Sequence, residues 1–397
     1  MEKSEKPRFQ SRKPKLYSFR IRKSPYYEAT QRYGCKSYTT YNNMYLPLVY
    51  EDLVSDYWYL KKDVSLWDVG CQRQVEITGP DAFNFLRHLT PRNLTNFKVG
   101  QCYYVPLTTE DGGILNDPVV LRLGENHFWL SVADRDIWLW AKGLAAGFKM
   151  QAAIQEPDIS PLAVQGPKSF DVVADLFGDW VRNLRYYWFK ETELDGIPLV
   201  LTRTGWSKQG GYELFLRDGS YGDQLWEIVM EAGKPYNIKP GTPCWIERIE
   251  SGLLNYWEDI NDSTNPYEVG LGKFVDLEQD VDFIGKEALK VIKSAGIKRK
   301  LVGLQIHSEP LSQSSDFWTV ECNDQPAGAI TSAVYSPDLD KNIAFAMVGI
   351  EYTEVGTQLV VDMGQEKADA TVTPLPFIDN RAKVWAGIKD QDRYPNA

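Results

Sequence analysis

Hydrophobic positions recur along the chain with two periods, one typical of helices and one typical of strands. Between Asp52 and Lys62, the apolar side chains Leu53, Tyr57 and Leu60 fall on one face of a predicted helix. Further helices are predicted over residues 82–89, 136–147, 221–232, 242–254 and 287–294. Alternating or continuously apolar runs predict strands over residues 65–69, 74–77, 101–107, 113–123, 127–132, 197–203 and 211–216. Residues 162–167 end one more strand and open one more helix.

The last part of the chain, from Lys300 to about Ile388, has a different pattern. Short apolar runs follow one another there at intervals of roughly 8–12 residues. The strands that these runs predict are 302–306, 319–322, 328–331, 344–350 and 358–361. A series of this kind is typical of a small barrel or sandwich.

Composition narrows the classes of partner. A chain of 397 residues is long enough for two or three domains. Its formal net charge of −10 argues against nucleic acid or an anionic membrane surface as the main partner. No apolar stretch approaches the roughly 20 residues that a membrane-spanning helix needs. Five dispersed cysteines without CxxC spacing predict reduced thiols and a cytoplasmic protein, and three widely separated histidines make a metal site such as zinc unexpected.

The N-terminal segment is strongly basic. Residues 1–23 hold nine Lys or Arg against two Glu, and they lack the apolar core of a secretory signal. We expect residues 1–24 to form a solvated arm. The alternative is an arm that wraps a neighbouring domain or subunit through Tyr17, Phe19 and Ile21.

Two short motifs combine a carboxylate with a glycine turn and a strand-like run. The first spans Gly112–Val120 and contains Asp117, and the second spans Thr204–Leu214 and contains Glu213. Neither motif has metal-ligand spacing or a nucleophile paired with histidine. From the pattern alone, Asp117 is either functional or part of a surface turn, and Glu213 is either functional or an exposed strand carboxylate.

With further blocks, these motifs resemble the glycine-cleavage T-protein (aminomethyltransferase) family. The blocks are residues 75–82, 162–167, 248–253, 265–272 and 328–332, so the resemblance covers roughly residues 50 to 350. It implies an α+β, three-domain fold, in which two mixed α/β folate-binding subdomains over residues 25–290 form a ring with a C-terminal β-barrel or jelly-roll-like domain over residues 295–390. It also implies an enzyme that uses tetrahydrofolate. For the oligomeric state, a homodimer is one alternative.

Departures from the usual family pattern indicate which molecule donates the one-carbon group. Residues 68–72 read Asp-Val-Gly-Cys-Gln where the family usually has D-V-S-H-M, and Asn116-Asp117 replaces a paired D-D. Residues 42–47, 73–77 and 102–107 instead resemble the dimethylsulfoniopropionate demethylase branch. That branch implies methyl transfer from a sulfonium to tetrahydrofolate, giving 3-methylthiopropionate and 5-methyltetrahydrofolate. The alternatives are a T-protein with a lipoyl carrier, a demethylase for an aryl methyl ether or a betaine, and a non-catalytic folate-binding module.

The resemblance also assigns expected roles to individual side chains. Asp117 is the expected catalytic residue, as a base, an orienting group or a counter-charge for the folate amine. Glu213 is expected to bind the pterin edge, and Arg248 to contact folate unless it is half of an ion pair with Glu247 or Glu250. Aromatic side chains expected to hold a sulfonium are Tyr104, which also contacts the cofactor, Trp206 and, more weakly, Trp188. Candidate carboxylate anchors are Lys36 and Tyr335.

Overall fold

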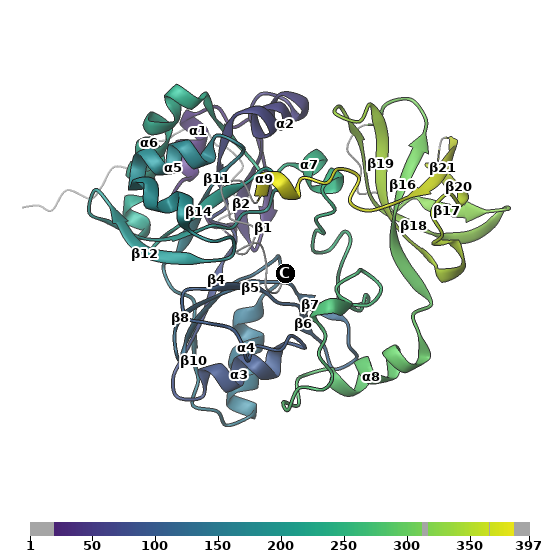
Figure 1. Ribbon diagram of the computed structural model, residues 1–397, viewed down its shortest axis with the longest axis horizontal. Helices are drawn as coiled ribbons and strands as arrows, with labels where there is room; N and C mark the ends of the chain where they lie inside the picture. The colour runs from purple at the N-terminus through teal and green to yellow at the C-terminus, as the bar shows by residue number, and fades with distance from the viewer. Residues whose placement is uncertain (1–19, 312–316, 365, 385–397) are drawn as a thin grey trace, which may run out of the picture.

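The structure, a computed structural model, describes residues 20–311, 317–364 and 366–384. Two α/β units and a β-barrel are arranged as a ring, with helix α7 (Trp245–Glu250) between the first unit and the barrel and long loops near the centre (Figure 1). The expected α+β architecture is confirmed. The predicted contacts of Tyr17 and Phe19 in the N-terminal arm lie outside the described residues.

The first α/β unit is built on a six-stranded sheet. Its strands, in pairing order, are β12 (Phe189–Leu194), β13 (Ile197–Thr202), β14 (Gly211–Leu216), β11 (Ser160–Gln165), β3 (Val64–Asp68) and β15 (Ile238–Gly241). Every residue of β11 and β14 is buried, as expected for central strands covered on both faces. One face packs against α1 (Tyr27–Arg32), α5 (Ser169–Phe177) and α6 (Gly222–Gly233).

The second α/β unit has a five-stranded antiparallel sheet. Its strands, in pairing order, are β10 (Ala153–Gln155), β4 (Gln74–Thr78), β9 (His127–Ser131), β8 (Val119–Gly124) and β5 (Cys102–Tyr104). Helices α3 (Ala82–Leu89) and α4 (Ile137–Gly147) cover one face. The other face meets the first unit, where Val200 and Phe215 share a buried cluster with Leu121 and Trp129. This contact of two sheets fixes how the two units are placed at the central cavity.

The chain passes back and forth between these units. Strand β3 lies in the first sheet, β4 in the second, and β11 in the first again. Smaller elements fill the connections: β1 (Ser37–Tyr41), β2 (Met44–Val49), α2 (Leu53–Lys62), β6 (Leu107–Thr108), β7 (Ile114–Asn116) and α8 (Lys286–Ala295). Because of this interleaving, residues far apart in sequence reach a common cavity.

The C-terminal part is a closed six-stranded barrel, which confirms the predicted small barrel or sandwich. Around the barrel the strands are β16 (Arg299–His307), β19 (Lys341–Gly349), β18 (Gln325–Ser336), β17 (Thr319–Cys322), β20 (Gln358–Asp362) and β21 (Lys367–Thr373). The sequence did not predict β21, because its inward positions Ala368 and Ala370 are too small to give a strong hydrophobic signal. Helix α9 (Arg381–Val384) follows the barrel.

Three predicted elements were too long, and one of them, the strand over residues 101–107, is divided into β5 and β6. The helix predicted over residues 242–254 is only α7, and Gly252, at a φ of 73°, follows its end. The strand predicted over residues 113–123 is divided into β7 and β8 by Asp117 and Pro118. The end of α7 and the break between β7 and β8 place loop residues at the cavity. In the ranges that the structure describes, none of the helices is long and apolar enough to cross a membrane.

Candidate functional site

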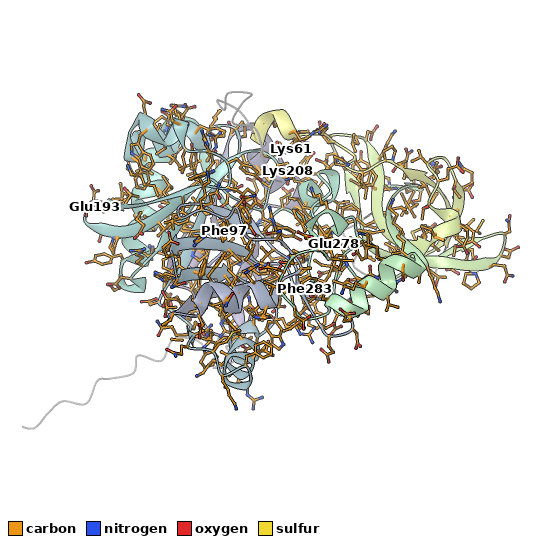
Figure 2. The ribbon with its side chains drawn as sticks, turned by 60° about the horizontal axis from the view of Figure 1, so that its bottom comes forward. Lys61, Phe97, Glu193, Lys208, Glu278 and Phe283 are labelled. Atoms are coloured by element: carbon orange, nitrogen blue, oxygen red, sulfur yellow. The ribbon has the colours of Figure 1, made fainter. Side chains whose placement is uncertain are left out.

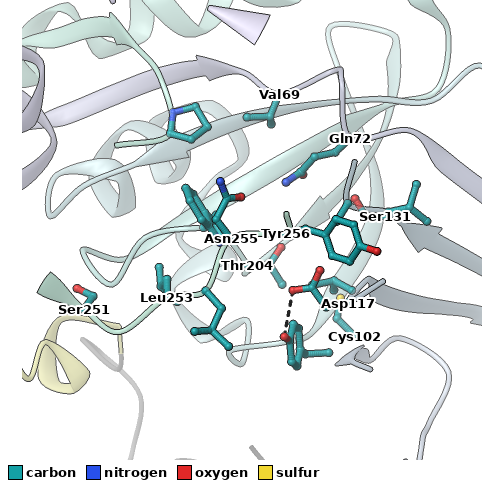
Figure 3. A pocket seen from close by; sticks show the side chains of 18 of the residues that line it. Val69, Gln72, Cys102, Asp117, Ser131, Thr204, Ser251, Leu253, Asn255 and Tyr256 are labelled. Atoms are coloured by element: carbon teal, nitrogen blue, oxygen red, sulfur yellow. Dashed lines mark hydrogen bonds between the residues drawn. The ribbon is translucent and has the colours of Figure 1, made fainter. Parts of the chain in front are cut away.

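A central cavity of about 1280 Å³ lies where the two α/β units and the barrel meet. The first unit contributes Thr204, Trp206 and Glu213, and the second contributes Tyr104 and Asp117. The loop over residues 251–258 and the start of the barrel complete the wall (Figure 3). Cavities for one small ligand usually measure about 300–1,000 Å³, so this one has room for a cofactor-sized molecule together with a small substrate.

Asp117 lies in the break between β7 and β8, with its side chain in the cavity wall. The hydroxyl of Tyr104 donates a hydrogen bond of 3.1 Å to its Oδ2, drawn as a dashed line in Figure 3. Asn116 fixes the break, since its Oδ1 accepts the backbone N–H groups of Asp117 and Ala133, each at 3.0 Å. Burial raises the pKa of Asp117 to about 7, although the Tyr104 hydrogen bond acts in the opposite direction. A carboxyl with this pKa exchanges protons readily near neutral pH.

Glu213 is the second buried carboxylate of the cavity. Its neighbours Tyr212 and Leu214 face the apolar core of the first unit, so strand alternation turns Glu213 toward the cavity. The Thr204 hydroxyl donates a hydrogen bond to Oε2. Burial raises the pKa of Glu213 to about 7. Within the described ranges, no cationic side chain forms an ion pair with it, so it can accept N–H groups from a ligand.

The loop between β13 and β14 carries Trp206 into the cavity wall. Glu247 of α7 holds this loop, because its Oε1 accepts the backbone N–H of Lys208 at 3.0 Å and Nε2 of Gln209 at 2.9 Å. Gly205 leaves room for the buried Gln165 side chain, because a Cβ there would lie 2.1 Å from Nε2 of Gln165, which donates hydrogen bonds to the backbone oxygens of Thr204 and Tyr212. The loop therefore has a fixed course between a buried acid and the central strands.

Aromatic side chains form much of the remaining wall. The cavity is lined by Tyr41, Tyr104, Trp188, Trp206, Trp245, Tyr256 and Trp257. Aromatic faces attract cations and also stack on flat heterocycles. The structure thus brings five of the predicted site residues to one cavity: Tyr104, Asp117, Trp188, Trp206 and Glu213.

Three other predicted site residues lie elsewhere. Arg248 is fully buried outside the cavity lining, where it forms an ion pair with Asp259 and donates a hydrogen bond of 2.6 Å to Ser332. The ion-pair partner of Arg248 is a loop carboxylate rather than Glu247 or Glu250, and the expected folate contact of Arg248 stays a prediction. Lys36 is exposed and donates to the backbone oxygen of Glu51 at 2.5 Å.

Tyr335 is the other candidate anchor outside the cavity lining. It belongs to β18 of the barrel, and its hydroxyl donates a hydrogen bond to Asp340. Neither Lys36 nor Tyr335 lies in the cavity lining, and their expected role as carboxylate anchors stays a prediction. The barrel instead reaches the cavity through Lys300 and Leu301, at the start of its first strand.

Sequence reasoning missed the loop Asn255–Glu258, all four residues of which line the cavity. Asp259 holds the start of this loop by accepting the backbone N–H of Asn255 at 2.9 Å. Trp257 has a φ of 80°, a region that bulky residues rarely adopt. Its indole N–H donates to the backbone oxygen of Asp134 at 2.8 Å. The only sequence signal was the pair of aromatic residues after Gly252.

Comparison with protein families gives two adjoining matches. The family model described as the GCVT N-terminal domain matches residues 26–279. The model described as the glycine cleavage T-protein C-terminal barrel domain matches residues 299–379. Together they cover both α/β units and the barrel.

Individual relatives match over nearly their whole lengths. Dimethylsulfoniopropionate demethylase DmdA of Ruegeria pomeroyi is 40% identical over 89% of this chain and 97% of its own. An aminomethyltransferase of Desulfitobacterium hafniense is 31% identical over 90% of this chain and 98% of its own. The crystal structure of glycine cleavage system aminomethyltransferase T from Bartonella henselae has the same fold, with a TM-score of 0.83 at 24% identity, covering 91% of this chain and 99% of that one.

Proposed function

The chain belongs to the glycine-cleavage T-protein family of aminomethyltransferases, and from this we propose that it is a tetrahydrofolate-dependent demethylase. The donor is dimethylsulfoniopropionate, and the products are 3-methylthiopropionate and 5-methyltetrahydrofolate. The observation that carries the proposal is the 40% identity, over 97% of its length, to a relative named as a dimethylsulfoniopropionate demethylase.

The shape and lining of the cavity support two ligands held side by side. Bound tetrahydrofolate would supply a nucleophilic nitrogen, and the sulfonium would give up its methyl group with the electron pair returning to sulfur as a thioether. Such a transfer needs alignment more than a reactive protein group. Aromatic rings such as Trp206 and Trp188 can hold the sulfonium by cation–π attraction, worth roughly 0.5–2 kcal/mol for each ring.

Asp117 is suited to the folate nitrogen. That nitrogen must be unprotonated to attack and becomes positively charged as the new bond forms. With a pKa of about 7, the Asp117 carboxylate can orient the amine, accept its proton or offset the passing charge. Tyr104 keeps the carboxyl oriented through its hydrogen bond of 3.1 Å.

Glu213 fits the pterin edge of a folate. A buried carboxylate without a cationic partner in the described part of the chain is costly unless a ligand supplies donors. The Thr204 hydroxyl takes one lone pair of Oε2, which leaves Oε1 and the other lone pair of Oε2 for a ligand. An aminopyrimidinone edge presents two parallel N–H donors, and one carboxylate can accept both.

We further propose that the reaction takes place in the cytoplasm with a small-molecule donor. The five cysteines are all free thiols, as expected in a reducing compartment. Association into a homodimer is compatible with this function, which needs only one cavity per chain.

The test is a donor panel with purified protein. Tetrahydrofolate is mixed with dimethylsulfoniopropionate, glycine betaine or an aryl methyl ether, and 5-methyltetrahydrofolate is quantified by liquid chromatography. We expect product from the sulfonium alone, unaffected by a metal chelator. Turnover of an aminomethyl-lipoyl carrier, with none from the sulfonium, would instead identify a glycine-cleavage enzyme.

A further inference from the structure

Glu247 of helix α7 is a fully buried acid that joins two loops of the cavity wall. Its Oε1 accepts the backbone N–H of Lys208 at 3.0 Å and Nε2 of Gln209 at 2.9 Å, two residues of the β13–β14 loop near the middle of the molecule (Figure 2). The same oxygen accepts the hydroxyl of Ser251 at 2.7 Å, at the start of the loop over residues 251–258. One carboxylate oxygen therefore ties together wall segments that belong to separate loops.

The burial of Glu247 is unfavourable in itself. Burial raises the pKa of its carboxyl, and the hydrogen bonds from Gln209, Ser251 and Lys208 act in the opposite direction. Among the described residues, no donor hydrogen-bonds to its other oxygen, Oε2. An apolar side chain of similar size would fill this place at a lower cost, because a buried carboxylate is expensive unless donors surround it. The acid therefore contributes the hydrogen bonds that hold the two loops rather than apolar packing.

The chain returns to this acid after the barrel. Nδ2 of Asn380 donates to the hydroxyl of Ser251 at 3.3 Å, and Nζ of Lys383 in α9 donates to Oε1 of Gln209 at 2.6 Å. Both side chains that donate to Glu247 are thus held a second time, by the segment that follows β21. In Figure 1, α9 lies next to α7.

The segment that follows β21 also packs closely against the β13–β14 loop. Gly210 of this loop has a φ of 84°, and a Cβ there would lie 3.2 Å from the backbone oxygen of Lys383. The Glu247 carboxylate favours the charged form of Lys383, although burial and the charge of Lys61 lower the pKa of this lysine. Shape, hydrogen bonding and charge therefore all fix the loop at the same point.

We propose that Glu247 and Lys383 are positioning residues that set the separation of two aromatic walls of the cavity and thereby the binding of the methyl donor. This inference rests on the proposed function. Trp206 lies on one of the two loops and Trp257 on the other, and both line the cavity. A small cation is sensitive to the placement of such rings, because cation–π attraction requires the charge within about 6 Å of each ring centroid.

The two loops should affect the donor more than the folate. Glu213 lies inside its sheet, paired with Ala163 on one side and Thr202 on the other. Asp117 is held by Tyr104 of the second unit. Loosening the loops leaves these strand positions unchanged, so donor binding and folate binding report different parts of the structure.

The first measurement is amide hydrogen exchange in the free protein. In Lys383→Met, which loses one hydrogen bond, we expect the amide of Lys208 to exchange about fivefold faster than in wild type. Lys383→Arg keeps a cationic donor and should restore most of the protection. Lys367→Met is the matched control, because Lys367 also donates a hydrogen bond of 2.6 Å, to Glu321 of the barrel, and lies outside the cavity lining.

The second measurement separates the donor from the folate. We expect the KM for dimethylsulfoniopropionate to rise about fivefold in Lys383→Met and further in Glu247→Leu, while the calorimetric affinity for tetrahydrofolate is unchanged in both. Glu247→Gln keeps one acceptor oxygen and should lie between wild type and Glu247→Leu. Should Glu247→Leu fail to fold, the comparison of Lys383→Met with Lys383→Arg decides alone.

The inference requires both changes, so unchanged loop exchange or an unchanged donor KM in an active Lys383→Met variant would overturn it. Equal weakening of donor and folate, or the same changes in Lys367→Met, would show a general structural effect and overturn it as well. Faster loop exchange in a protein that transfers no methyl group from a sulfonium would refute the proposed function, whereas the positioning of the loops would stand.

Discussion

The hydroxyl of Tyr104 lies 3.1 Å from Oδ2 of Asp117, and both residues line the central cavity. Tyr104 is the last residue of β5, and Asp117 immediately precedes Pro118 and β8, the strand with which β5 pairs. Strand pairing therefore holds the donor beside the acceptor. The hydrogen bond favours the ionised carboxylate while burial opposes it, so the carboxyl can change its protonation state near neutral pH.

Replacing Asp117 by Asn should reduce kcat and leave the KM for the donor nearly unchanged. The asparagine keeps the size of the side chain and can still accept the Tyr104 hydrogen bond, but it cannot take a proton or offset charge. Loss of a general base alone costs about 10²–10⁴-fold. We expect a loss at the lower end of this range, because the thioether that leaves a sulfonium is already a good leaving group. Steady-state kinetics check this, and a change confined to the donor KM would make Asp117 a counter-charge for the sulfonium instead.

The same carboxyl predicts the pH dependence of the reaction. Burial raises the pKa of Asp117 from its ordinary 3.8 to about 7, so the ionised form becomes scarce below neutral pH. We expect kcat to fall as pH decreases through about 7, and this decline should be absent in Asp117→Asn. A wild-type profile that stays flat from pH 8 to pH 5 would contradict a role for the ionised group.

The free energy of unfolding should decrease as pH rises, whereas kcat should increase. A raised pKa means that the folded protein holds more protons than the unfolded chain between about pH 4 and pH 7. The contribution of Asp117 to the free energy of unfolding is therefore present at low pH and lost as pH rises through about 7. Denaturant titrations should show Asp117→Asn gaining stability relative to wild type between pH 5 and pH 8.

Sequence patterns predicted the parts of the site that depend on local order. Glu213 follows a glycine turn in a strand that was predicted correctly, but all six residues of this strand are buried, so the pattern alone left its exposure open and the family resemblance supplied its expected role. The burial and partners of Arg248 could not be predicted from local sequence. Its partner Asp259 is a loop residue 11 positions later, and Ser332 lies in the barrel.

Glu213→Gln should weaken the binding of tetrahydrofolate by roughly 1–3 kcal/mol. A glutamine presents one acceptor and one donor, so one pterin N–H would face another N–H instead of an oxygen. Calorimetry on the inactive binary complex gives the affinity directly. Glu193→Gln, on the exposed part of β12, is the control for the loss of one negative charge (Figure 2). Unchanged affinity in Glu213→Gln would remove this residue from the folate site.

Arg248→Met should destabilise the fold rather than abolish a folate contact. Arg248 and Asp259 are both fully buried, and removing the arginine leaves a carboxylate whose remaining partners are the hydroxyls of Thr331 and Ser332 and a backbone N–H. Breaking such a pair costs about 3–5 kcal/mol. Urea unfolding should show this loss, and adding Asp259→Asn should recover part of it. A variant with normal stability and weaker folate binding would restore the role expected from sequence.

Trp206→Ala should raise the KM for the cationic donor while barely changing the KM for tetrahydrofolate. The Trp206 ring lines the cavity, on a loop that Glu247 holds by two hydrogen bonds. Its face attracts positive charge in the ground state as well as during transfer, so the loss should appear in binding. A cation–π contact of roughly 0.5–2 kcal/mol corresponds to a change of about 2- to 30-fold.

Two comparisons separate this attraction from simple loss of packing. Trp206→Phe keeps an aromatic face and should recover much of the donor affinity. Inhibition by the product 3-methylthiopropionate should weaken less in Trp206→Ala than binding of the donor, because the product keeps the chain and acid group of the donor but its sulfur carries no positive charge. Equal weakening of both molecules would mean that Trp206 contributes apolar contact only, and the sulfonium would then have to bind against another aromatic wall, with Trp188 and Trp257 as the next rings to replace.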